Sequence, residues 1–516
     1  MQTKIKTAII DIGSNTVRLV IYDYDAREGL HELGNMKVVA RLRTHILPSG
    51  EMAEEGIVLL ENTLRDFVEM LEDFSVTDVR VAATAAVRQA TNREAIIARM
   101  SQRLGLTIDL LSEEQEAYYG FAGVAYSLAT PSAVTIDIGG GSTEITLFRD
   151  KELIHSKSFP FGTVSLKQMF VKGEVLSNNE QKQLQAYVLE QLSQIDWITN
   201  CELPVIGIGG SARNIAQIHQ QRQNYGLTGV HGYEMTAQDL RKLNDFLGSM
   251  TYDELKQLDG LSSDRADIIV PALCVFRILL GIVGTTRFQL TKKGLREGLV
   301  MERILQADPE AFDKYHVFDT HAKQLAAEYR RSAIEVDNLV QLAEKMYDEC
   351  CRLNFFTYQA DDKELIRKAA KVFAIGEYIE LSSSSQHTFY LIANQAIDGL
   401  NHVERIKVAL LASYKNKDYF THFVEPFESW LEEDELHKLR DFGAMLKFAY
   451  AFTISKRGVI KDLTMAHEGD HVRLTAHMQK NAAAEKYQAE RHKKHLERVI
   501  KEDIIVHFNE EGLNNE

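Results

Sequence analysis

Two stretches of the chain share one pattern: an apolar run that ends in Asp-Ile-Gly, a few small residues, and a second apolar run. The first is AIIDIGSNTVRLVIYD (residues 8–23) and the second is AVTIDIGGGSTEITLF (residues 133–148). Short apolar runs on either side of a glycine turn are typical of two buried strands joined as a hairpin. Each stretch therefore predicts a β-hairpin with a carboxylate, Asp11 or Asp137, beside its turn, and the repeat indicates a duplicated unit.

A third glycine-rich loop, Gly207-Ile208-Gly209-Gly210-Ser211, follows a short apolar run and precedes a predicted helix. Small residues leave backbone N–H groups free to hold phosphate oxygens, and the N-terminus of a helix favours an anion. None of the three loops matches the dinucleotide fingerprint, and the sequence has no Gly-Lys-Ser/Thr P-loop. One such loop is most often a plain turn, but three in this order predict a phosphate site.

The charge and the hydropathy pattern exclude several classes of protein. A formal net charge of −15 argues against a general nucleic-acid binder, which is normally basic. No apolar run reaches the roughly 18 residues of a membrane span, and the start of the chain lacks the apolar core of a secretory signal. The four cysteines have no metal-binding spacing, as is typical of reduced thiols. We therefore expect a cytoplasmic protein of several domains that makes no membrane contact.

Periodicity divides the chain into two α/β parts followed by a helical part. In the first part we predict strands over 7–24 and 38–46, helices over 51–73 and 92–104, and a further helix that begins at a capping box of Ser112 and Gln115. The pattern restarts after Pro131, with helices predicted over 176–198 and 237–303. From about residue 306 helices predominate, and a charged helix is predicted over 482–502.

Eight motifs then occur in an order that one enzyme family shows. They are DIGSNTVRL, ATAAVRQATN, SEEQEAYYGFAGV, DIGGGSTEITLF, FGTVSL, GIGGSARN, RADIIVPAL and GLREGL. Across residues 5–303 the sequence resembles the exopolyphosphatase/guanosine pentaphosphate phosphohydrolase family, a branch of the actin-like ATPase (sugar kinase) superfamily. The resemblance implies an α/β fold with two duplicated actin-like (ribonuclease H-like) domains, over residues 1–125 and 126–305, that clamp phosphates between the two hairpins.

Residues 306–516 are similar to a degenerate His-Asp phosphohydrolase domain and are expected to be mainly helical. Phe373 and Ala374 stand where that domain has its His-Asp pair, whereas His387 matches another of its histidines. One histidine without the pair cannot assemble the usual metal site. We therefore expect a non-catalytic region that serves substrate binding or forms a homodimer.

The resemblance implies an exopolyphosphatase, a phosphoric anhydride hydrolase that transfers the terminal phosphoryl group of inorganic polyphosphate to water with the help of Mg²⁺. Glu116 is the implied general base, although Ser112-Glu113-Glu114-Gln115-Glu116-Ala117 differs at two places from the family's Ser-Gly-x-Glu-Glu-Ala. Glu113 and Glu114 are alternatives, but the preference of a helix N-terminus for acidic residues explains both. Asp137 and Glu144 are the expected ligands of Mg²⁺, which prefers hard oxygen donors.

The expected phosphate-binding residues come from the three loops and from arginines near them. They are Asp11, Gly13, Ser14, Asn15, Thr16, Arg18, Arg88, Gly139, Gly140, Gly141, Ser142, Thr143, Gly209, Gly210, Ser211 and Arg265. For Arg88, a surface salt bridge is an equal alternative to a bidentate phosphate contact. For Arg265, the alternative is a buried helix cap with Asp267.

Other functions stay open. Guanosine pentaphosphate is the competing substrate, alone or beside polyphosphate, although the sequence shows no base pocket. Polyphosphate needs a basic channel, which Lys and Arg of SKRGVIKDL, LTKKGLREG and the last helix could line across a dimer. A sensor that binds polyphosphate or a nucleotide with little catalysis is the alternative of another class, favoured by the altered Ser112–Ala117 segment. An actin-like kinase is disfavoured, because no adenosine-pocket Gly-Gly followed by an acceptor site is recognisable.

Overall fold

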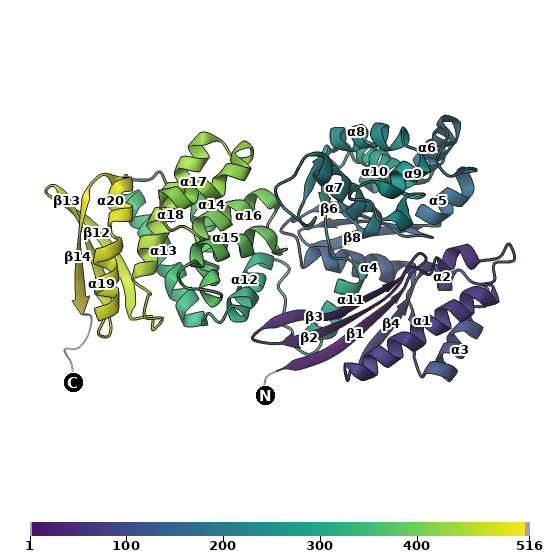
Figure 1. The fold of residues 1–516 in the computed structure, drawn as a ribbon, viewed down its shortest axis with the longest axis horizontal. Coiled ribbons are helices and arrows are strands. Elements are labelled where there is room, and N and C mark those ends of the chain that lie inside the picture. Colours follow the sequence, from purple (N-terminus) through teal and green to yellow (C-terminus); the bar gives the residue numbers. More distant parts are fainter. Residues whose placement is uncertain (1–2, 511–516) are drawn as a thin grey trace. The chain divides into compact units, whose positions relative to one another are not determined.

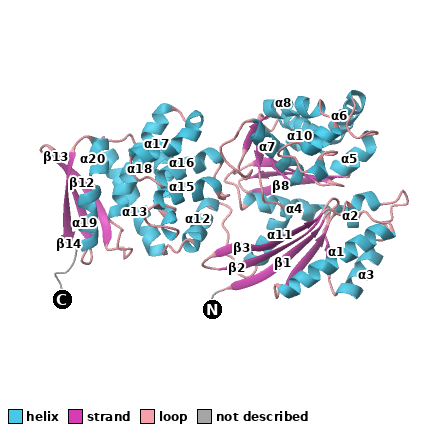
Figure 2. Cartoon of the chain, in the orientation of Figure 1, coloured by secondary structure: helices cyan, strands magenta, loops and turns pink. Residues whose placement is uncertain are grey.

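Each Asp-Ile-Gly hairpin forms the antiparallel part of a mixed β-sheet in the computed structural model, which describes residues 3–510 (Figures 1 and 2). The first sheet has the order β3-β2-β1-β4-β5, and β1 pairs antiparallel with β2 and parallel with β4. Its strands are β1 (Lys4–Ile12), β2 (Val17–Asp25), β3 (Gly29–Val38), β4 (Asp78–Ala83) and β5 (Ile108–Leu110).

The second sheet repeats the first. Its order is β10-β11-β9-β6-β7-β8, and β6 pairs antiparallel with β7 and parallel with β9. Its strands are β6 (Ala133–Ile138), β7 (Thr143–Arg149), β8 (Glu152–Phe159), β9 (Val205–Ile208), β10 (Glu234–Thr236) and β11 (Arg287–Leu290). Read from β8 to β11, the strand directions match those of β3 to β5, and β10 is added at the edge. The repeat seen in two short hairpins is thus a repeat of the whole sheet.

Helices cover both faces of the first sheet (Figure 1). α1 (Glu54–Asp73) and α3 (Arg93–Leu104) pack on the face to which Ala8, Ile10 and Ile12 of β1 point. α4 (Glu113–Ala125) and α11 (Leu295–Leu305) pack on the other face, together with Ile9. Since side chains alternate along a strand, Asp11 lies on the face of Ile9, toward α4 and α11.

α4 connects the two sheets. Its Tyr119 packs in the core of the first sheet, and its Phe121 packs in a core that includes β9 of the second. The helix lies very close to α11, because a Cβ on Gly298 would come within 2.1 Å of the Tyr119 carbonyl oxygen. The predicted capping box of Ser112 and Gln115 begins the helix, with both hydrogen bonds present. The first turn of α4 is therefore held rigidly against both halves of the fold.

Six helices of the second half pack on one face of the second sheet, opposite the face on which α4 lies (Figure 1). They are α5 (Thr163–Phe170), α6 (Asn178–Leu192), α7 (Gly209–Arg222), α8 (Ala237–Gly248), α9 (Tyr252–Gln257) and α10 (Ile269–Val283). α10 is almost wholly apolar and contributes most of its residues to the core of this half. It is the central helix against which α6 and α8 pack.

The third strand of the first sheet lies earlier in the chain than the predicted strand over 38–46. β3 ends at Val38, and Leu42–His45 form a 3-10 helix that follows Arg41, whose φ of 45° is left-handed. The prediction was wrong because β3 is an edge strand whose side chains are mostly not buried. The stretch GLHELGNMKV therefore lacks the apolar pattern that marks an interior strand.

The described chain separates into two compact units. Residues 3–225 and 229–317 form the first, and residues 226–228 and 318–510 form the second. Within the first unit, α11 follows the second sheet in sequence but packs on the first. The domain limits at 125/126 and 305/306 stay predictions.

The second unit is mainly helical and ends in a small sheet of order β12-β13-β14 (Figure 2). Its elements are α12 (Val317–Glu328), α13 (Ala333–Arg352), α14 (Ala360–Lys371), α15 (Ser384–Asn394), α16 (His402–Ala412), α17 (Lys417–Val424), α18 (Glu433–Ala451), β12 (Ile460–Glu468), β13 (His471–Met478), α19 (Ala483–His492), α20 (Lys494–Ile500) and β14 (Asp503–Glu510). Within residues 3–510, no helix is both long and apolar enough to cross a membrane.

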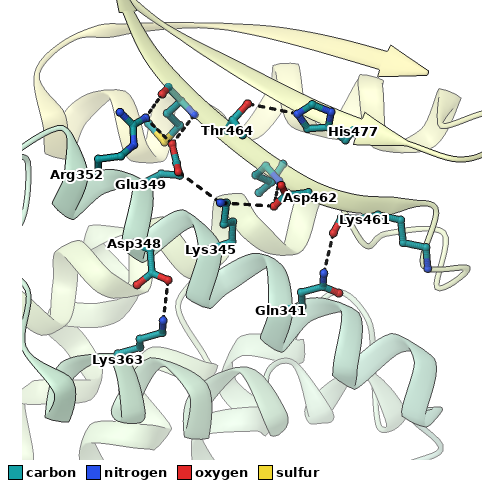
Figure 3. Close-up of polar contacts among 12 residues, drawn as sticks. Gln341, Lys345, Asp348, Glu349, Arg352, Lys363, Lys461, Asp462, Thr464 and His477 are labelled. Carbon is teal, nitrogen blue, oxygen red and sulfur yellow. Dashed lines mark hydrogen bonds and ion pairs between the residues drawn. The ribbon is translucent and has the colours of Figure 1, made fainter. Parts of the chain in front are cut away.

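Polar contacts join α13 to the first strand of this small sheet (Figure 3). The buried Glu349 of α13 accepts a hydrogen bond from the backbone N–H of Met465 (2.8 Å) and pairs with Arg352 (2.6 Å). Gln341, two turns earlier, donates to the carbonyl of Lys461 (2.8 Å). These contacts satisfy edge groups of β12 and fix the sheet to the helix.

Candidate active site

A cavity of about 340 Å³ lies between the two hairpins of the first unit. All three glycine-rich loops line it, together with the start of α4 and the start of α11. The predicted site residues that line it are Asp11, Gly13, Ser14, Asn15, Thr16, Arg18, Glu116, Asp137, Gly139, Gly140, Ser142, Glu144, Gly209, Gly210 and Arg265. The fold thus brings separate stretches of the sequence to one place.

Four predicted site residues do not line this cavity. Gly141 packs against the first hairpin, where an added Cβ would lie 2.9 Å from the hydroxyl oxygen of Ser14. The Thr143 hydroxyl donates to the carbonyl of Phe161 (2.7 Å), and the Ser211 hydroxyl accepts a hydrogen bond from an arginine described below. The fourth, Arg88, contacts a cavity residue rather than the cavity. The phosphate contacts expected of these four stay predictions.

Arg88 forms an ion pair with Glu116, in the first turn of α4. Its Nη1 lies 2.8 Å from Glu116 Oε2 and also donates to the carbonyl of Leu111 (2.9 Å). The two side chains are only 15% and 13% exposed, so the salt bridge is an interior one and not the surface pair considered for Arg88. Burial raises the pKa of Glu116 to about 7, although Arg88 acts to lower it. A carboxylate that titrates near neutral pH is suited to general base catalysis.

The two hairpins place different charges at equivalent positions. Asp11 of β1 is the register partner of Arg18 on β2, whereas Asp137 of β6 is the register partner of Glu144 on β7. The first hairpin thus pairs a carboxylate with a guanidinium, and the second pairs two carboxylates. Only the second arrangement suits a divalent cation with oxygen ligands.

The buried carboxylates of the second hairpin fit a Mg²⁺ ion. Burial raises the pKa of Asp137 to about 6, and burial together with the charges of Glu116 and Asp137 raises the pKa of Glu144 well above its usual value. A divalent cation beside these two carboxylates would favour their charged forms and offset the effect of burial. No cluster of three or more His, Cys, Asp or Glu residues in the described part of the chain is arranged to hold a metal ion. A Mg²⁺ ion held by two carboxylates takes its other ligands from water and substrate oxygens.

More basic side chains line the cavity than the three loops and their neighbouring arginines predict. Lys292, Lys293 and Arg296 belong to LTKKGLREG, one of the stretches expected to line a basic channel across a dimer. Lys37 and Arg213 were not predicted at all. The sequence does indicate Arg213, because it lies one helical turn after Gly209 of the third loop. In the structure its Nε donates to the Gly209 carbonyl (3.1 Å).

Arg265 is held at the third glycine loop. Its Nη1 donates to the Ser211 hydroxyl (3.1 Å). A Cβ added to Gly210 would lie only 2.1 Å from its Nη2, so the guanidinium packs directly on this glycine. Asp267 pairs instead with Arg41 (3.2 Å) and Lys167 (2.5 Å). This contradicts the alternative in which Arg265 forms a helix cap with Asp267.

Comparison with known families matches most of the chain. Residues 20–307 match the model of the Ppx/GppA phosphatase family, and residues 317–495 match the model of Ppx/GppA phosphatase, domain III. The guanosine-5'-triphosphate,3'-diphosphate pyrophosphatase of Vibrio cholerae is 25% identical over 417 residues, 77% of this chain and 78% of that protein. The protein of the same name from Aeromonas hydrophila is 24% identical over 492 residues, 91% of this chain and 92% of that protein.

Solved structures resemble more than half of the chain. A Ppx/GppA family member from Aquifex aeolicus is 26% identical, with a TM-score of 0.53, and covers 59% of this chain and 99% of its own. An exopolyphosphatase from Cytophaga hutchinsonii is 25% identical, with a TM-score of 0.55, and covers 59% of this chain and 98% of its own. These similarities, together with the helices α12–α20 of the second unit, confirm the predicted fold class, two actin-like α/β parts followed by a mainly helical region.

Proposed function

Because the chain belongs to the Ppx/GppA phosphatase family, we propose that it is an exopolyphosphatase, which hydrolyses the terminal phosphate of inorganic polyphosphate. The match to the family model and to the named relatives confirms the family resemblance. It also confirms the enzyme class, a phosphoric anhydride hydrolase. One observation carries the choice of substrate: the residues that line the cavity include seven lysines and arginines but no aromatic residue. Such a lining suits a chain of phosphates and offers no stacking surface for a base.

Unpaired polar groups in the cavity support a bound anion. Both amide atoms of Asn15 and the Nε of Arg18 are buried without a hydrogen-bond partner in the described structure. Buried polar groups are normally satisfied, so these atoms are available to phosphoryl oxygens and to the water among them. Backbone N–H groups of the glycine loops add donors at the same place.

Glu116 supplies the base in this proposal. It accepts a proton from the attacking water, whose oxygen bonds to the terminal phosphorus while the bridging P–O bond breaks; the products are orthophosphate and a chain one phosphate shorter. Arg88 holds the carboxylate in place, and the cavity arginines Arg213, Arg265 and Arg296 stabilise the charge that develops on the phosphoryl oxygens. Asp137 and Glu144 would hold Mg²⁺, which would supply further charge stabilisation at the phosphoryl group.

Guanosine pentaphosphate is the second candidate substrate. The names of the similar proteins from Vibrio cholerae and Aeromonas hydrophila favour it, and a terminal phosphate of a nucleotide fits the same loops if the base stays outside the cavity. A sensor with little catalysis is the remaining alternative. A homodimer stays a prediction.

Phosphate release by the full chain with Mg²⁺, from long-chain polyphosphate and from guanosine pentaphosphate, tests the proposal. We expect kcat/KM for polyphosphate to be at least about tenfold higher, since only polyphosphate fills the basic lining beyond the terminal phosphate. A reversed ratio establishes the second candidate. Binding of either compound without phosphate release contradicts both and supports the sensor.

A further inference from the structure

A second cavity, of about 660 Å³, opens among the helices of the second half and shares no residue with the first. Three helices each present one face to it, since their lining residues are spaced three and four apart. They are Lys182, Gln185, Ala186 and Leu189 of α6, Ala237, Leu240 and Arg241 of α8, and Cys274, Arg277, Ile278, Leu280 and Gly281 of α10. The three helices therefore leave a common groove unfilled.

The groove is positively charged. Lys182, Arg241 and Arg277 line it, and none of its lining residues is acidic. Within residues 3–510, none of these three side chains forms a hydrogen bond or an ion pair with the protein, and the Nε of Arg277 is buried without a partner. Buried donors are normally satisfied in folded proteins, so the Nε of Arg277 is available to an acceptor in the groove.

The remaining lining is largely apolar. Leu189 is 50% exposed at the groove, and Ile278 and Ala186 lie beside it. The volume lies within the range of roughly 300–1,000 Å³ that small organic ligands occupy. An inorganic anion would leave the apolar surface of the groove uncovered. A neutral apolar molecule would leave Lys182, Arg241 and Arg277 without a counter-charge. The lining therefore favours a ligand with both an anionic group and an apolar part.

We propose that this groove binds a small organic anion that carries an apolar body. Its carboxylate, sulfonate or phosphate head pairs with Arg277, Arg241 and Lys182, and its body covers Leu189 and Ile278. The proposal does not depend on which phosphorylated substrate the first cavity takes.

The test uses the dye 1-anilinonaphthalene-8-sulfonate, an aromatic anion whose fluorescence rises on burial, titrated into the full chain. We expect saturable binding that weakens about tenfold in Arg241→Gln and in Arg277→Gln, the usual effect of losing one charge-assisted hydrogen bond. Leu189→Asp is expected to weaken it as well, because it removes apolar contact and adds a like charge. The matched control is Lys242→Gln, which removes the same charge from the next residue of α8, outside the groove, and leaves binding unchanged.

Competition identifies the ligand chemistry. Decanoate, which has an aliphatic body and a carboxylate, is expected to displace the dye, whereas inorganic phosphate and pyrophosphate are not. Absence of saturable binding, equal binding by the Arg241→Gln variant and the wild type, or displacement by pyrophosphate would overturn the proposal. Arg241 is exposed on α8, so its variant remains informative if Arg277→Gln fails to fold.

Discussion

Arg88 Nη1 lies 2.8 Å from Glu116 Oε2, and this ion pair joins the short helix α2 (Ala85–Arg88), which follows β4, to the first turn of α4. Both side chains are largely buried, and Glu116 faces the cavity while Arg88 does not. The arginine therefore orients the carboxylate from behind and opposes the effect of burial on its pKa.

Glu116→Gln removes the proposed base without changing the size of the side chain. We expect kcat for phosphate release to fall by at least about 100-fold, the lower end of what general base catalysis contributes, while substrate binding persists. Glu113→Gln, at the exposed first residue of α4, is the matched control and should keep full activity. Full activity of Glu116→Gln would falsify the assignment of the base.

Arg88→Met leaves Glu116 buried without its cation. Arg88 lowers the pKa of Glu116, so its loss raises that pKa above about 7. Since the base works only when deprotonated, the acidic fall in kcat/KM should move to higher pH. The measurement is the pH profile of kcat/KM, and Arg149→Gln, which removes an exposed arginine of β7, controls for net charge. An acidic limb at the same pH in wild type and Arg88→Met contradicts the coupling.

Gly210→Ala tests how the third loop holds Arg265. An added Cβ would come within 2.1 Å of the guanidinium, so the arginine must leave its place. We expect kcat/KM to fall roughly tenfold or more, as in Arg265→Gln. The double variant should be no worse than either single one, because both changes remove the same interaction.

The control for Gly210→Ala is Gly248→Ala, at the end of α8, where a Cβ has no neighbour within 4 Å. A Gly210→Ala enzyme with wild-type kcat/KM would show that the position of Arg265 is unimportant for the reaction.

Glu144→Gln weakens the proposed Mg²⁺ site. It removes one of two carboxylates that are register partners on β6 and β7, so we expect the Mg²⁺ concentration for half-maximal activity to rise at least about tenfold. EDTA should abolish wild-type activity, and added Mg²⁺ should restore it. Glu152→Gln, an exposed carboxylate on β8, serves as the control. An unchanged Mg²⁺ dependence removes Glu144 from the set of ligands.

Glu349→Ala should loosen the small sheet of the second unit. The change leaves the backbone N–H of Met465 without its acceptor and Arg352 without its ion pair (Figure 3). We expect a loss of about 1–3 kcal/mol in unfolding free energy, with faster amide hydrogen exchange in β12. Asp348→Asn removes a carboxylate that is more exposed than Glu349 (41% against 8%) from its pair with Lys363 on α14, and should cost about 0–1 kcal/mol. Equal effects of the two variants argue against a special role of Glu349.

Local sequence chemistry was enough to predict much of the fold. A capping box is formed by residues three apart, so Ser112 and Gln115 predict the start of α4 correctly. Each hairpin likewise depends on an apolar run, a glycine turn and another apolar run, all within about 16 residues. The edge strand β3 was not predicted, because its side chains are mostly not buried and form no apolar pattern. Its position is set by its pairing with β2.

The sequence by itself determined that three loops of small residues follow buried strands, because the strands and turns that create them are local. Only the tertiary structure decided that Arg88 pairs with Glu116 while Asp267 pairs with Arg41, and that Lys37 and Arg213 reach the same cavity as Asp11. Those relations join residues separated by up to 226 positions, and no local pattern encodes such a distance. The raised pKa values of Glu116 and Asp137 have the same origin, since burial from water is a property of the packed fold and not of the residue.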